Sequence, residues 1–166
     1  MTGTTRVIVG LSGSLSSLAA LYRAVEEAAR LGATLVPVVA WSPSDGTGCG
    51  DLRPLSELEH AARKRLDTAF AQTFGGYPAG LVVHPLVVQG HAGAALVRAV
   101  TGPADLLVVG TGGHGRLDRL LHRSVLRYCR TCATCRVIAV SPSELLERLT
   151  LTARSGAPLP LAAGGR

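Results

Sequence analysis

Apolar runs of five to eight residues alternate with longer amphipathic stretches along most of this chain. Each run is rich in Val, Ile or Leu and ends near Gly, Ser or Pro, which is typical of a buried strand. In the longer stretches, apolar residues recur every three or four positions, which is typical of a helix packed on one side. The pattern predicts strands at 6–11, 35–40, 81–88, 105–110 and 136–140, and helices at 18–31, 54–74, 92–100 and 121–132.

This order of elements defines the expected architecture. Strands that are apolar throughout, separated by helices, favour a parallel sheet with helices on both faces. Right-handed crossovers leave a doubly wound α/β fold, a three-layer α/β/α sandwich with a five-stranded parallel sheet, as the simplest topology. Such sheets bind ligands beyond the carboxyl ends of their strands, where the winding reverses. The loops after Gly10 and Gly110 are therefore the first places to search for a site.

The C-terminal part of the chain carries a separate helix signal. Ser141, Pro142 and Glu144 have the types and spacing of an N-cap, a first-turn proline and a capping-box glutamate. They predict a short helix that ends at Leu149. Ala, Gly and Pro dominate after Thr150, so we expect a mobile tail there.

Composition narrows the class of protein without indicating a function. Hydrophobic residues make up 47% of the chain and charged residues 17%, which excludes a disordered chain and predicts a sizeable core. No apolar run approaches the roughly 20 residues of a membrane helix. The first strand begins almost at once, at Arg6, with no signal-peptide-like segment before it. We therefore expect a cytoplasmic protein without a membrane partner.

The formal net charge is +6, and its densest part is a cluster of six arginines with one acidic neighbour, Asp118. Such a cluster fits phosphate capture or docking on an acidic protein partner, and it equally fits a solvated helix face. Nucleic-acid binding is not expected, because interleaved aromatic residues and a recognisable binding module are both missing. The six residues are Arg116, Arg119, Arg123, Arg127, Arg130 and Arg136.

One glycine-rich loop carries the main chemical signal. Gly110, Gly112 and Gly113 close a predicted strand, and the chain then leads through Arg123 to Ser124 at a predicted helix start. The N–H groups of such a loop can approach an anion closely, and the helix N-terminus adds its positive end. A tight strand-to-helix turn would use the same glycines without any ligand.

These residues resemble the signature of the universal stress protein family, which has an adenine-nucleotide α-hydrolase-like fold. Its nucleotide-binding members carry Gly, two residues, Gly, nine residues, and then Gly followed by Ser or Thr. Gly110, Gly113 and Ser124 match this pattern, and Arg123 takes the place of the third glycine. Further matches lie at 7–14, 39–41, 105–110 and 135–140. The resemblance implies strand order 3-2-1-4-5, a universal stress protein domain over 1–141, and a short helix with a mobile tail over 142–166.

The resemblance also implies a site for ATP or AMP, with Mg²⁺ only alongside ATP. The implied contacts are Ser12, Gly13, Ser14, Ala40, Gly110, Gly113, Arg123 and Ser124. Ser12 stands where the family usually has an acidic residue, which removes a carboxylate expected near the sugar or metal. Arg123 replaces a glycine that lets the backbone approach the triphosphate, so its side chain either obstructs the phosphates or binds them.

A rival interpretation starts from the loop at 12–17. It loosely resembles the PP-loop of ATP pyrophosphatases, which would make the protein an adenylating enzyme. Ser14 and Ser16 replace a glycine and the aspartate of that loop, so it offers no carboxylate for magnesium. The chain contains no Ser-His-Asp arrangement, paired catalytic carboxylates or HExxH motif. We therefore expect a non-catalytic protein with no catalytic residues.

The cysteines and histidines give weaker signals. Cys129, Cys132 and Cys135 have CxxCxxC spacing, which is compatible with metal ligation. Cys129 and Cys132 also continue a helical stripe, so we interpret them as small core residues and expect no metal site. Cys49, in a glycine-rich loop, is the better candidate for a reactive thiol. His114 and His122 flank the glycine-rich loop. We expect His60 on a helix surface, and His84 and His91 give no signal.

Two functions remain open at this point. One is a non-catalytic regulatory module that binds an adenine nucleotide. The other is a nucleotide-free stress-response protein that acts through its surface on an unknown protein partner. In both, the resemblance implies a homodimer that pairs through the last strand, at Val137–Val140. An apolar edge there would otherwise invite aggregation, and a twofold partner would cover it.

Overall fold

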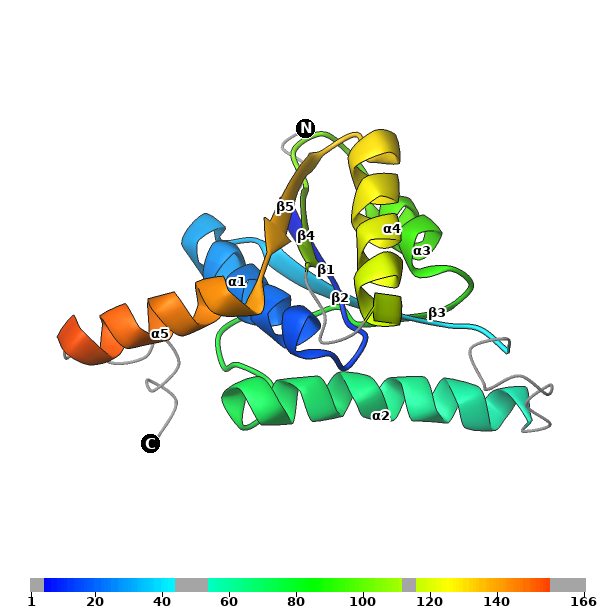
Figure 1. The fold of residues 1–166 in the computed structure, drawn as a ribbon, viewed down its shortest axis with the longest axis horizontal. Coiled ribbons are helices and arrows are strands. Elements are labelled where there is room, and N and C mark those ends of the chain that lie inside the picture. Colours follow the sequence, from blue (N-terminus) through cyan, green and yellow to red (C-terminus); the bar gives the residue numbers. More distant parts are fainter. Residues whose placement is uncertain (1–4, 44–53, 112–115, 156–166) are drawn as a thin grey trace.

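The computed structural model describes residues 5–43, 54–111 and 116–155, and only the backbone of residues 116–123. Within these ranges the chain forms five strands and five helices in alternation (Figure 1). In chain order they are β1 (Arg6–Gly10), α1 (Leu15–Leu31), β2 (Thr34–Trp41), α2 (Leu55–Phe74), β3 (Leu86–Gln89), α3 (Ala92–Ala99), β4 (Leu106–Gly110), α4 (Arg116–Cys132), β5 (Arg136–Val140) and α5 (Pro142–Ser155).

The strands form one parallel sheet in the order β3-β2-β1-β4-β5, which confirms the expected fold class. β1 lies at the centre, where Ile8 pairs with Val36 of β2 on one side and with Leu107 of β4 on the other. Because every pairing is parallel, all strands end at one edge of the sheet, called the carboxyl edge below, and begin at the amino edge. The winding reverses between β1 and β4, which is where such sheets bind ligands.

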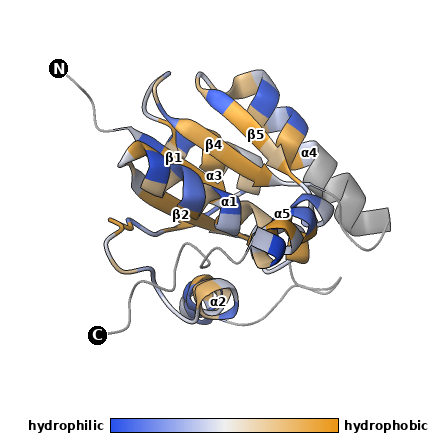
Figure 2. Cartoon of the chain, turned by 90° about the vertical axis from the view of Figure 1, so that its left-hand side faces the viewer, coloured by the Kyte–Doolittle hydropathy of each residue, from blue (hydrophilic) through white to orange (hydrophobic). Residues whose placement is uncertain are grey.

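Alternate side chains of the strands build two hydrophobic layers. Val7 and Val9 belong to the layer covered by α1 and α2, while Ile8 belongs to the layer covered by α3 and α4. Figure 1 shows these two pairs of helices on opposite sides of the sheet. Figure 2 shows mainly hydrophobic strands between helices that carry both kinds of residue. Both layers are built mostly from aliphatic residues, as the low aromatic content predicts.

The predicted start of the third strand is wrong. β3 covers only Leu86–Gln89, although residues 82–84 already run beside β2. The Leu35 amide donates to the Val82 carbonyl at 2.9 Å, and the His84 amide donates to the Leu35 carbonyl at 2.8 Å. Pro85 has no N–H to continue this ladder, so regular pairing resumes only after it.

The predicted start of α4 and the predicted end of α5 are also wrong. α4 begins at Arg116 rather than at Leu121, because four of the five residues before Leu121 are Arg or Leu, which are good helix formers. α5 continues to Ser155 instead of ending at Leu149, so the first part of the expected tail is helical. None of the helices in the described ranges combines the length and apolarity needed to cross a membrane.

α5 packs against α1 through ion pairs and through Leu145, a half-buried residue that contacts the hydrophobic layer of α1 and α2. The Glu144 amide donates to Ser141 Oγ at 3.3 Å, so the predicted N-cap is present. The Glu144 carboxylate, however, pairs with Arg23 of α1 at 3.3 Å. A second pair joins Arg148 of α5 to Glu26 of α1. These two ion pairs hold α5 against α1.

A buried carboxylate closes the amino edge of the sheet. Asp105 is 5% exposed, and its Oδ2 accepts hydrogen bonds from the Thr101 amide at 2.7 Å and the Thr101 hydroxyl at 2.9 Å. The Gly102 amide adds a third bond, and Arg6 contacts both carboxylate oxygens at 3.3 Å. Burial alone would raise the pKa of Asp105, but the bonds from Thr101 and Arg6 outweigh it and lower that pKa.

Candidate functional site

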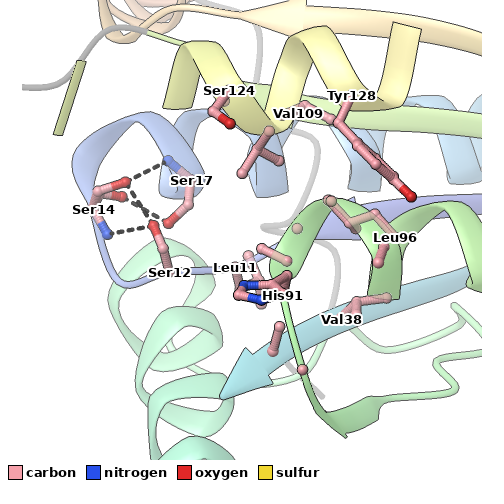
Figure 3. Close-up of a pocket in the computed structure, with 18 of the residues that line it drawn as sticks. Leu11, Ser12, Ser14, Ser17, Val38, His91, Leu96, Val109, Ser124 and Tyr128 are labelled. Carbon is pink, nitrogen blue, oxygen red and sulfur yellow. Dashed lines mark hydrogen bonds between the residues drawn. The ribbon is translucent and has the colours of Figure 1, made fainter. Parts of the chain in front are cut away.

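A cavity of about 690 Å³ opens at the carboxyl edge of the sheet (Figure 3). It lies where the winding reverses, among the ends of β1, β2 and β4 and the residues of α1, α3 and α4 that face them. Its volume falls within the range of small-molecule sites, roughly 300–1,000 Å³. The fold therefore provides a cavity of ligand size at the place where the sheet topology predicts one.

The loop after β1 supplies the hydroxyl-rich side of the cavity. Ser12, Ser14 and Ser17 all line it. Ser14 is the N-cap of α1, and its Oγ accepts from the Ser17 amide at 3.2 Å. The same oxygen lies 2.9 Å from the hydroxyl of Ser12 and 3.0 Å from that of Ser16 (Figure 3 shows the bonds among Ser12, Ser14 and Ser17). α1 thus begins at Leu15, earlier than predicted, with its positive amino end at the cavity.

The glycines of the predicted site have different roles. A Cβ atom at Gly110 would lie 2.3 Å from the Ser16 carbonyl oxygen. β4 therefore needs glycine there to pass beneath the first turn of α1, which is a packing role. Gly13 instead has φ of +84°, and a Cβ atom added there would meet nothing within 4 Å. Backbone conformation rather than space therefore favours glycine at this second position.

α4 contributes Ser124, Val125 and Tyr128 to the cavity. The prediction that Ser124 stands at a helix start is wrong, because α4 begins at Arg116 and Ser124 lies more than two turns along it. Ser124 therefore reaches the cavity with its side chain in the middle of a helix. An anion site made of amides at that position is not available.

The structure brings together most of the predicted contacts. Gly13 lies between two lining serines. Gly113 and the side chain of Arg123 are outside the described residues, as are His114 and the side chain of His122. The predicted contacts that line the cavity are Ser12, Ser14, Ala40, Gly110 and Ser124.

Sequence reasoning missed the start of α3. Gly90, His91 and Gly93 all line the cavity, and His91 is the exposed N-cap residue of α3. The Gly90 amide donates to the Trp41 carbonyl at 2.8 Å, which fixes this turn to the end of β2. A signal was present, because Gly90 follows a strand and Gly93 lies in the first turn of the helix after it. The winding reversal points only to the loops after the first and fourth strands, and this turn follows the third.

The described lining combines an apolar interior with positive charge. Val38, Leu96 and Val109 form part of the apolar surface, whereas Arg65 of α2 and His91 are the basic residues. No carboxylate occurs among the described residues of the lining. Two helix N-termini, those of α1 and α3, add partial positive charge at the same place. Such a site suits a ligand with a flat, weakly polar part and an anionic part.

The three clustered cysteines are placed differently from one another. Cys129 is fully buried, and burial raises the pKa of its thiol to about 11. Cys132 is exposed, so its interpretation as a core residue is wrong. Cys135 is half-buried, and burial together with the charge of Asp105 raises the pKa of its thiol. Within the described ranges, no three His, Cys, Asp or Glu side chains could hold a metal ion, and Cys49 lies outside those ranges.

The fold and the cavity define a doubly wound α/β protein whose candidate ligand site lies at the switch point of the sheet. A profile of the universal stress protein family matches residues 3–141. The chain therefore belongs to the universal stress protein family. The matched region ends at the residue before α5, so this helix lies outside the part that the profile covers.

Solved structures of the family have the same fold. A universal stress protein crystallised in complex with cAMP is 28% identical, with a TM-score of 0.55, and covers 82% of this chain and 96% of its own. Universal stress protein UspA from Lactobacillus plantarum is 23% identical, with a TM-score of 0.62 and coverages of 84% and 99%. A family member from Burkholderia pseudomallei is 23% identical, with a TM-score of 0.55 and coverages of 84% and 98%. A search of curated proteins gives no match.

Proposed function

We propose that this protein is a non-catalytic regulatory module that binds an adenine nucleotide in the cavity at the carboxyl edge. The observation that carries the proposal is the joint presence of hydroxyl groups, an apolar interior and two basic residues, Arg65 and His91, around one cavity of about 690 Å³. The serines and helix N-termini suit a phosphate, and the apolar interior suits a base.

The comparisons support the choice of ligand. A universal stress protein with 28% identity was crystallised in complex with cAMP. AMP and cAMP carry one phosphate group, which Arg65 and two helix N-termini can balance without a metal. ATP carries more charge, and its binding here is expected to need Mg²⁺. We therefore rank AMP and cAMP above ATP as ligands.

Isothermal titration of the full chain with AMP, cAMP and ATP, with and without Mg²⁺, tests this function. Ala40→Leu places extra bulk in the cavity lining and should weaken nucleotide binding at least about tenfold. Ala71→Leu, the same change at an exposed position of α2, should leave binding unchanged. If acid extracts of the purified protein contain no nucleotide and titration shows no binding, the function is wrong.

The role of Arg123 is tested by Arg123→Gly, which restores the residue of the family pattern. A gain in nucleotide affinity means that the arginine obstructs the phosphates. A loss means that it binds them. No change means that the position does not take part in binding.

We also propose a homodimer that forms through β5. β5 is a border strand of the sheet, and Val137, Ile138 and Ala139 are half-buried in the single chain. A second β5 would pair with its free edge and cover these residues. Sedimentation at micromolar concentration should give twice the mass of one chain, and Ala139→Lys should shift the protein toward the monomer. A monomeric wild type would contradict the proposal, and Ala71→Lys serves as the control.

The dimer also carries the second candidate function, that of an interaction protein without a nucleotide. The free edge of β5 favours it independently of the cavity. A dimer that binds no nucleotide in the titrations above would support this function over the first.

A further inference from the structure

Tyr128 is the aromatic residue of the cavity lining, and its exposure is not explained by the fold. Its side chain extends from α4 beside Leu96 (Figure 3). The residue is 45% exposed, although it carries one of the largest apolar surfaces in the chain. Among the described residues, nothing forms a hydrogen bond with its hydroxyl. The ring is thus held in place by something other than a polar contact.

The contact that holds Tyr128 comes from the first turn of α3. A Cβ atom at Gly93 would lie 3.0 Å from Cδ1, 3.1 Å from Cγ and 3.2 Å from Cβ of Tyr128. The Cβ and Cγ atoms of Tyr128 therefore pack against the backbone of Gly93, which has no side chain. Any side chain there would push against the ring. This packing fixes the ring in position and leaves its outer part free.

The rings of the other two tyrosines both make contacts that stabilise the fold. Tyr22 is 8% exposed and stacks on Phe74, with ring centroids 5.9 Å apart. Tyr77 is about as exposed as Tyr128, but it stacks on Phe70 at 4.4 Å and donates a hydrogen bond to Asp67. Tyr128 has neither a stacked ring nor a hydrogen-bond partner in the described part of the chain. Its aromatic surface is available to a ligand.

We propose that Tyr128, Gly93 and Leu96 form an aromatic subsite that holds the planar ring of the ligand by stacking on Tyr128. Leu96 is 2% exposed and gives the subsite an apolar wall. The serines of the first loop lie at another part of the cavity (Figure 3), where they suit the phosphate. The subsite therefore selects heteroaromatic ligands over sugar phosphates. This inference rests on the proposed function and names the group that recognises the base.

Titration of the full chain with AMP and with ribose 5-phosphate tests the subsite, because the second ligand has the phosphate and sugar but no ring. Stacking on an aromatic side chain strengthens binding of a base by about five- to a hundredfold. Tyr128→Leu should therefore weaken AMP binding about tenfold or more and leave ribose 5-phosphate within about twofold. Tyr128→Phe keeps the ring and should bind AMP within about twofold of wild type. Thr131→Leu, an exposed change one turn along α4, is the control.

Each outcome decides one point. If Tyr128→Leu binds AMP like wild type, the subsite is wrong and the proposed function stands. If it loses affinity for both ligands equally, Tyr128 has only a structural role and the subsite is again wrong. If wild type binds neither ligand, the function and the subsite fail together.

A second measurement covers the case in which Tyr128→Leu does not fold. In protein with labelled tyrosine rings, the Tyr128 signal is assigned by its absence in Tyr128→Phe. AMP should shift this signal upfield through the ring current of the base, and ribose 5-phosphate should not. An unchanged Tyr128 signal on saturation with AMP would overturn the subsite.

Discussion

The polar groups at the amino edge and at the carboxyl edge of the sheet have different roles. At the amino edge, one buried carboxylate, that of Asp105, collects hydrogen bonds from Thr101, Gly102 and Arg6 and joins the start of β1 to the loop before β4. At the carboxyl edge, the serines after β1 bond mainly to one another, and a cavity remains beside them. The amino edge is therefore expected to hold the fold together, and the carboxyl edge to bind ligand.

The largest effect is expected from Asp105→Ala. The change leaves Arg6 and the amides of Thr101 and Gly102 without their partner in a buried place. We expect a loss of about 4 kcal/mol in the free energy of unfolding, measured by urea denaturation. Asp105→Asn keeps an acceptor oxygen and should lose about half as much. A loss below about 1 kcal/mol for the alanine variant would mean that this edge is not the one that holds the fold.

Gly110→Ala is an exception to this comparison. Gly110 lies at the carboxyl edge, but its substitution should still destabilise the protein. Its Cβ would approach the Ser16 carbonyl oxygen to 2.3 Å, so β4 and α1 must move apart. We expect a loss of about 3 kcal/mol by the same measurement. Gly13→Ala strains only the local backbone and should lose about 1 kcal/mol. Equal losses would show that the contact with α1 is not tight.

Acid should weaken the amino edge selectively. The pKa of Asp105 is lower in the folded protein than in the unfolded chain, where an Asp carboxyl has a pKa of about 3.9. The stabilisation is therefore complete above that pH and is lost as the pH falls through the lower, folded value. Wild type should lose stability more steeply than Asp105→Asn below about pH 4. Parallel pH profiles of the two proteins would contradict this assignment.

The smallest effect is expected from Ser14→Ala, at the start of α1. The change removes the N-cap bond to the Ser17 amide, and it should reduce stability by about 1 kcal/mol. Ser12→Ala removes an exposed hydroxyl contact and a long bond from the Ser14 amide, at 3.4 Å, and should lose less than half as much. Thermal unfolding of the two variants makes the comparison. A larger loss for Ser12→Ala would assign the structural role in this loop to the wrong serine.

The fold class was predictable because most strands are apolar throughout, a pattern that favours a parallel sheet between helices. The strand order was implied by the family resemblance. The errors arose where local chemistry interrupts that pattern. Pro85 breaks the ladder beside β2, and the polar start of α4 hides a helix that begins at Arg116. Cys132 continues the helical stripe, but it is the last residue of α4 and is exposed there.

The order of the strands alone predicts the site only where it follows a strand, and the family resemblance adds Ala40 and Ser124. Ser12, Ser14 and Gly110 lie directly after β1 or at the end of β4, so the topology alone brings them together. Tyr128 and Arg65 reach the cavity from within helices, and their participation depends on how those helices pack. The family pattern reaches Ser124 in α4 in this way, but nothing in the spacing of the chain indicates Tyr128 or Arg65.

Trp41 gives this protein an internal optical reporter. It is the only tryptophan in the sequence, it is 6% exposed, and its carbonyl accepts the amide of Gly90 at the start of the α3 turn. Its indole belongs to the hydrophobic layer of α1 and α2, on the other side of the sheet from α3 and α4. Emission from this one fluorophore therefore follows the unfolding of that layer without a label. A spectral change on adding nucleotide would show that filling the cavity alters the surroundings of this indole.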